Sequence, residues 1–107
     1  MQPFTFVVKF RFDTTEYYET SFNITLSDIE IAYVKDFLKE NGDVPFWAFE
    51  FENERLFNRM MQEHIAAILK CVNQNFVDSN EEPYTEETLG WDHIIPEFYW
   101  PDELLKP

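Results

Sequence analysis

The chain has 107 residues, of which 45% are hydrophobic and 19% aromatic, and its formal net charge is −13. The hydrophobic content excludes a disordered chain, and the length fits one domain with its own core. The charge argues against direct binding to nucleic acid or to a membrane surface, because the eight Lys and Arg residues are scattered singly along the sequence.

The sequence also indicates the cellular compartment in which we expect the protein. Cys71 is the single cysteine, which excludes an internal disulfide. The longest uninterrupted apolar run, residues 65–69, is far too short to span a membrane. The opening residues MQPFTFVVKFRF lack the basic and apolar regions of a signal peptide, so we expect a cytoplasmic protein.

The N-terminal segment predicts a β-hairpin. Residues 4–12 alternate between large apolar and smaller or charged side chains, which is typical of a strand with one buried face. Residues 13–16 predict a turn, and residues 17–25 a second strand. The side chains expected on the buried face are Phe4, Phe6, Val8, Phe10 and Phe12 in the first strand, and Tyr18, Thr20, Phe22 and Ile24 in the second.

A helix is predicted from Ser27 to about Asn41. Ser27 followed by Glu30 forms a capping box, and Gly42 can adopt the left-handed conformation that ends a helix. Its apolar stripe is expected to contain Ile29, Tyr33, Val34, Phe37 and Leu38. Residues 43–52 are ambiguous between a short strand and a turn into the next helix, and we favour an extended or irregular segment packed on the core.

A longer helix is predicted from Asn53 to about Asn75. Its apolar residues recur at three- and four-residue spacing, namely Phe57, Met60, Met61, His64, Ile65, Ile68, Cys71 and Val72. Residues 78–88 predict a polar loop, in which Thr85 caps a short turn and Gly90 ends it. Residues 94–100 predict a last strand, and Pro96 and Pro101 favour an edge position for it.

These elements predict a single α+β domain over residues 1–107. It would consist of an N-terminal antiparallel hairpin, two helices packed on one face of the sheet and a C-terminal edge strand.

The sequence offers little support for catalysis or for a bound cofactor. The two glycines, Gly42 and Gly90, are too few for phosphate-binding loops or a nucleophile elbow. We interpret His64 as a half-buried core histidine hydrogen-bonded to a neighbour, with a base or metal ligand as the alternative. His93 is interpreted as structural or exposed, and Cys71 as buried. We therefore expect no enzyme activity, no cofactor and no metal site.

One partial metal motif is present. Asp78, Asn80 and Glu82 match the first positions of a calcium loop, but Pro83 replaces the required glycine and Leu89 the bidentate glutamate. A cluster of Glu50, Glu52 and Glu54 is interpreted as a solvated surface beside a helix start.

The charge is concentrated near the C-terminus. Residues 76–107 contain one base, Lys106, and nine acids, a balance of −8, together with several large aromatic residues. Such a surface is suited to a basic partner, although it can also serve solubility alone. The residues predicted to bind the partner are Asp78, Glu81, Glu82, Glu86, Glu87, Trp91, Asp92 and Trp100.

The leading hypothesis is a small protein-interaction module, an inhibitor or immunity-type protein whose carboxylates mask a basic surface of its partner. The alternative is a small-ligand-binding or enzymatic domain with a pocket near His64. Self-association as a homo-oligomer, through a sheet edge or through Trp47, Phe49 and Phe51, is a third interpretation.

Overall fold

Two strands near the N-terminus and one near the C-terminus form a single sheet. The computed structural model describes residues 1–11, 16–48, 51–76, 80 and 82–106. Within them β1 (Gln2–Arg11) and β2 (Tyr17–Leu26) form an antiparallel hairpin. β3 (Ile95–Tyr99) pairs antiparallel with the other side of β1, so the strand order is β2-β1-β3. The predicted hairpin and edge strand are confirmed.

The alternation in β1 does bury one face of the sheet. Phe4, Phe6, Val8 and Phe10 are all buried, whereas the residues between them are more exposed. Phe6 pairs with Phe22 of β2, and their rings stack with centroids 5.2 Å apart. Phe12 lies outside the described residues.

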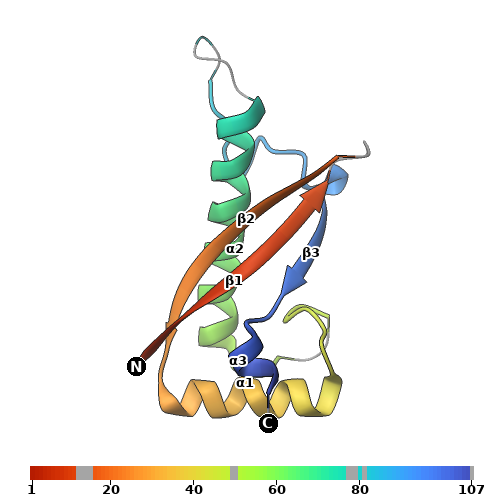
Figure 1. Ribbon diagram of the computed structural model, residues 1–107. Coiled ribbons are helices and arrows are strands. Elements are labelled where there is room, and N and C mark those ends of the chain that lie inside the picture. The colour runs from red at the N-terminus through yellow and green to blue at the C-terminus, as the bar shows by residue number, and fades with distance from the viewer. Residues whose placement is uncertain (12–15, 49–50, 77–79, 81, 107) are drawn as a thin grey trace.

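α2 (Glu54–Phe76) covers the buried face, and in Figure 1 it runs behind the sheet, with most of its sheet contacts to β2. Asn53 begins it as predicted, because its Oδ1 accepts a hydrogen bond from the Leu56 N–H at 3.1 Å. The buried side chains of α2 follow the predicted spacing and are Leu56, Met60, His64, Ala67, Ile68, Cys71 and Val72.

α1 (Asp28–Asn41) crosses the lower end of the sheet and of α2 in Figure 1. Its capping box is confirmed in both directions between Ser27 and Glu30, and Gly42 ends it with φ +80°. Val34, Phe37 and Leu38 are buried as predicted, but Ile29 is 82% exposed. At 3.6 residues per turn Ile29 lies on the far side of the helix from this buried stripe.

The segment between the helices is irregular rather than a strand. Phe46, Trp47 and Ala48 form a turn, and Phe46 is fully buried, a core position that the sequence pattern did not reveal. The Tyr33 hydroxyl accepts hydrogen bonds from the backbone N–H groups of Glu52 (2.7 Å) and Asn53 (3.2 Å), which fixes the entry to α2. Phe49 and Glu50 lie outside the described residues.

The C-terminal part adds two short elements that were not predicted. A 3₁₀ helix, η1 (Trp91–His93), precedes β3, and a single helical turn, α3 (Asp102–Leu105), packs against α1. Leu104 of α3 is buried. The result is the predicted compact α+β domain. Among the described residues, no helix has the length and apolar character needed to cross a lipid bilayer.

Candidate functional site

A stripe of side chains on α2 forms one wall of a pocket. Met61, His64, Ile65 and Ile68 follow one another at three- and four-residue spacing, so they share one face of the helix. The pocket has a volume of about 660 Å³, within the range of roughly 300–1,000 Å³ that small-ligand sites occupy. We call it the His64 pocket, and its lining residues are Trp47, Met61, His64, Ile65, Ile68, Glu86, Glu87, Trp91, Ile94 and Pro96.

The opposite wall is the chain that precedes and enters β3, and Asn73 of α2 fixes its start. The Asn73 side-chain N–H donates to the Tyr84 carbonyl oxygen at 3.0 Å, and its Oδ1 accepts from the Tyr84 N–H at 2.7 Å. This reciprocal pair satisfies both backbone groups of Tyr84. It ties the loop to α2 at a point eleven residues after Asn73 in the chain.

A tight turn then directs the acidic side chains to the pocket. The Leu89 N–H donates to the Thr85 carbonyl oxygen at 3.0 Å, and the Leu89 side chain is buried. The indole N–H of Trp91 donates to the Glu86 carbonyl oxygen at 2.7 Å. These contacts hold Glu86, Glu87 and Trp91 together in the wall opposite α2.

His64 is the one buried polar side chain among the described residues and is only 5% exposed. Its ring lies 5.0 Å from the Trp47 ring and 6.2 Å from the rings of Phe22, Phe46 and Phe98, measured between centroids. Its Nδ1 is buried and has no hydrogen-bond partner in the described structure. This corrects the prediction of a half-buried histidine bonded to a neighbour.

The apolar surroundings determine the charge of His64. Burial lowers its pKa from 6.5 to about 4, so the imidazole is neutral at pH 7. A neutral imidazole has one nitrogen that donates and one that accepts. A buried polar atom without a partner is costly to the fold. The His64 ring also lines the pocket, which makes the residue a candidate for contact with a ligand.

The structure divides the eight predicted contact residues into groups. Glu86, Glu87 and Trp91 line the His64 pocket, and Trp91 is half-buried. Glu82 and Asp92 are exposed but do not line it. Asp78 and Glu81 lie outside the described residues, so nothing is assigned to them.

Trp100 does not belong to this surface, which corrects its prediction as a contact residue. It is only 4% exposed, and its indole N–H donates to the Val44 carbonyl oxygen at 2.6 Å. Its ring packs on Phe6, Phe37 and Phe98. Trp100 follows β3 directly and continues its alternation, so it faces the core as Phe98 does, which leaves little of its surface for a partner.

Cys71 and the possible metal ligands are the remaining candidates for a chemical role. Cys71 is buried, and this burial raises the pKa of its thiol although a hydrogen bond from Asn75 opposes the change. Its sequence interpretation as a core residue is therefore confirmed. No group of three His, Cys, Asp or Glu side chains suited to a metal ion occurs among the described residues.

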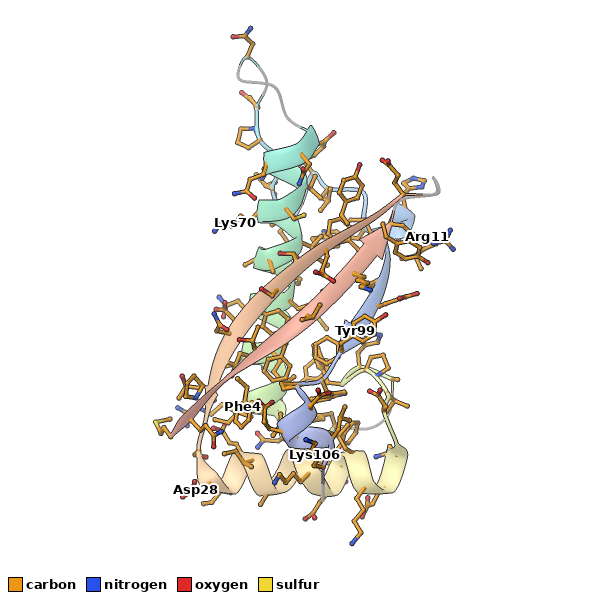
Figure 2. All side chains as sticks on the ribbon, in the orientation of Figure 1. Phe4, Arg11, Asp28, Lys70, Tyr99 and Lys106 are labelled. Carbon is orange, nitrogen blue, oxygen red and sulfur yellow. The ribbon has the colours of Figure 1, made fainter. Side chains whose placement is uncertain are left out.

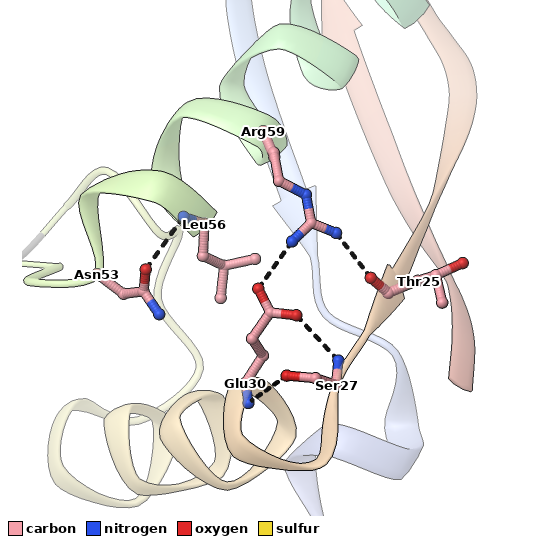
Figure 3. A network of polar contacts seen from close by, with 6 residues as sticks. All are labelled: Thr25, Ser27, Glu30, Asn53, Leu56 and Arg59. Carbon is pink, nitrogen blue, oxygen red and sulfur yellow. Dashed lines mark hydrogen bonds and ion pairs between the residues drawn. The ribbon is translucent and has the colours of Figure 1, made fainter. Parts of the chain in front are cut away.

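A polar junction that the sequence did not predict joins β2, α1 and α2 (Figure 3). Arg59 of α2 donates through Nη1 to Glu30 Oε2 and through Nη2 to the Thr25 carbonyl oxygen, both at 2.7 Å. Burial of Glu30 tends to raise its pKa, but the hydrogen bond from the Ser27 N–H and the charge of Arg59 outweigh it and lower the pKa. We call this set of contacts the Arg59 junction.

The fold also gathers some of the scattered bases. Lys35 and Lys39 are one helical turn apart on α1, and with Lys106 they line a second hollow of about 760 Å³ above Leu38 and Leu104. Other bases are far from it, since Arg11 and Lys70 lie toward the opposite end of the molecule in Figure 2. The expectation that all eight bases are isolated therefore needs correction at this one place.

Neither protein-family models, nor curated proteins, nor solved structures yield a match to this chain. The His64 pocket itself combines apolar walls, two indole rings and two carboxylates, and no lysine or arginine is among the described residues that line it. Such a surface suits an amphipathic cation, because the cation can contact both the ring faces and the carboxylates.

Proposed function

We propose that this protein is an interaction module that binds a basic partner through the His64 pocket and the exposed acids around it. The observation that supports this most directly is the lining of the pocket, where Glu86, Glu87 and Trp91 lie beside the apolar face of α2. Tryptophan is enriched at interaction hot spots. In this proposal the module acts in the cytoplasm as an inhibitor or immunity-type protein.

The distribution of charge supports the same proposal. The net charge of −13 attracts a basic macromolecule over a distance, and residues 76–107 contribute most of it. Glu82 and Asp92 are exposed and belong to the same acidic stretch of sequence as Glu86 and Glu87. Long-range attraction accelerates encounter, whereas the pocket supplies the desolvated contact that holds the partner.

A second candidate is a small-ligand-binding or enzymatic domain, and His64 favours it specifically. Its position in the pocket wall and its pKa, which burial lowers, are features of a ligand site as well as of a partner site. A small molecule that binds at the pocket with no dependence on salt would favour this candidate over the basic partner.

The test uses a fluorescent oligolysine peptide as probe and compares two variants of equal net charge. The first replaces Glu82, Glu86, Glu87 and Asp92 by their amides, and the control does the same at four exposed acids elsewhere, Glu19, Asp36, Glu40 and Glu63. Fluorescence anisotropy at low and high salt gives the affinities. We expect at least about a tenfold loss for the first variant and less than about threefold for the control. Equal losses would mean that only net charge matters and would contradict the proposal.

A further inference from the structure

We propose that the His64 pocket receives an arginine side chain of the basic partner, an inference that rests on the function proposed above. The pocket, an open hollow of about 660 Å³, has an apolar wall, aromatic faces and carboxylates. Each of these features matches one part of an arginine side chain. No other common side chain carries all the matching parts.

The apolar wall fits the stem of the guest. Met61, Ile65 and Ile68 on α2 face Ile94 and Pro96 at the entry to β3. Arginine and lysine both bury an aliphatic stem along such surfaces while the charged end reaches a polar region. This wall therefore favours a long side chain but does not distinguish between the two bases.

The two indoles favour the guanidinium group. Trp47 and Trp91 both line the pocket and are half-buried, and Trp91 is held in place by its hydrogen bond to the Glu86 carbonyl oxygen. A guanidinium stacks on an indole face, whereas an ammonium is compact and strongly hydrated. Because the indole N–H is already hydrogen-bonded, the ring is held in place before the guest binds. Stacking on it therefore costs little further conformational entropy.

The polar groups complete the match. Glu86 and Glu87 provide carboxylates that a guanidinium can bind through two parallel hydrogen bonds. His64 also lines the pocket, but its unpartnered Nδ1 is itself buried and is not open to the guest. The five N–H donors of a guanidinium are therefore matched by the two carboxylates. Glu86 and Glu87 are exposed, and an uncharged apolar guest would gain no ionic contact from them, whereas a guanidinium would.

The experiment uses short capped peptides with a lysine on each side of one central residue, which is arginine, citrulline, lysine or norleucine. The flanking lysines are common to all four, so they report on the general acidic surface. Citrulline has the shape of arginine without its charge. Affinities come from NMR titration, in which the indole N–H signals of Trp47 and Trp91 report on the pocket and that of buried Trp100 serves as an internal reference.

We expect the arginine peptide to bind about tenfold more tightly than the citrulline peptide and to shift the Trp47 and Trp91 signals but not that of Trp100. The double variant Glu86→Gln/Glu87→Gln should remove most of this arginine advantage, and His64→Leu, which replaces a ring in the pocket wall, should reduce it. The matched control Asp36→Asn/Glu40→Gln, which removes two exposed charges on α1, should preserve it.

The outcomes separate the two proposals. If all four peptides bind with equal, salt-sensitive affinity, the arginine assignment is overturned while the acidic interaction surface stands. If the norleucine peptide matches the arginine peptide and both shift Trp91, the pocket is merely apolar and the assignment is again overturned. If none of the peptides binds at low salt, both proposals are contradicted.

Discussion

Arg59 and His64 are two polar residues on one helix, five positions apart, and their surroundings differ completely. Arg59 is partly exposed, and its guanidinium is bonded to Glu30 and to the Thr25 carbonyl oxygen. His64 is almost fully buried, and its Nδ1 has no partner in the described structure. The contacts of Arg59 are those expected of a structural residue, because its guanidinium and the Glu30 carboxylate are paired with each other.

The two residues illustrate different roles, Arg59 in the stability of the fold and His64 in the proposed binding of a guest. The Arg59 junction connects three elements and stabilises the fold. The buried Nδ1 of His64 lacks a hydrogen-bond partner, which costs stability, and the ring that carries it forms part of the pocket wall. Substitutions at the two positions should therefore change the free energy of unfolding in opposite directions.

The largest effect is expected at the Arg59 junction. Arg59→Met keeps the aliphatic stem but removes both hydrogen bonds and leaves the largely buried Glu30 carboxylate without its cation. We expect the free energy of unfolding to fall by about 2–3 kcal/mol in denaturant titrations. Arg55→Met, an exposed position in the first turns of the same helix, is the control and should change it by less than about 0.5 kcal/mol.

The pH dependence of stability should reveal His64. Its pKa is about 4 in the folded protein and 6.5 ordinarily, so the unfolded chain binds more protons between these values. The stabilising contribution of the neutral imidazole is thus present above pH 6.5 and is lost as the pH falls toward 4. From pH 7 to pH 5 this group should lower the free energy of unfolding by about 2 kcal/mol.

The measurement is the difference between the wild type and His64→Leu, in which the contributions of other titrating groups largely cancel. Parallel stability curves for the two proteins across this pH range would show that His64 is not buried in neutral form.

His64→Leu should also stabilise the protein at pH 7. Leucine has a similar size, prefers the helix and carries no polar atom that needs a partner. We expect a gain of about 1 kcal/mol in the free energy of unfolding, together with weaker binding of the arginine peptide. A large loss of stability, comparable to that of Arg59→Met, would instead assign His64 a structural role.

The smallest effect on stability is expected at Asn73. Asn73→Ala removes the two exposed hydrogen bonds to Tyr84 and should cost only about 0.5 kcal/mol. Because this pair ties the acidic wall to α2, the affinity for the arginine peptide should fall several-fold. Asn58→Ala, an exposed change on the same helix, is the control and should alter neither quantity. Unchanged peptide affinity in Asn73→Ala would show that the wall is positioned by other contacts.

Local patterns in the sequence predicted much of the fold. The alternation around Phe6 identified β1, and the reciprocal pair of Ser27 and Glu30 identified the start of α1. These features depend on residues close together in the chain. Phe46 was missed because its burial depends on a turn that folds onto distant rings, including those of Phe57 and Phe98.

The candidate site was predictable only in its parts. The acidic residues of the C-terminal third and His64 were each identified, but as separate hypotheses. Their meeting in one pocket depends on the chain returning to α2 after Tyr84, which no local pattern reveals. Trp100 was assigned to the surface on composition alone, although its position two residues after Phe98 places it on the core side of the chain.

The central claim, that the unpartnered His64 lies beside the guest, is tested most directly by intermolecular nuclear Overhauser effects in the complex with the arginine peptide. The account predicts contacts from the arginine side-chain methylene protons to the rings of His64 and Trp91. Contacts confined to the exposed acidic residues Glu82 and Asp92, with none to His64, would contradict it.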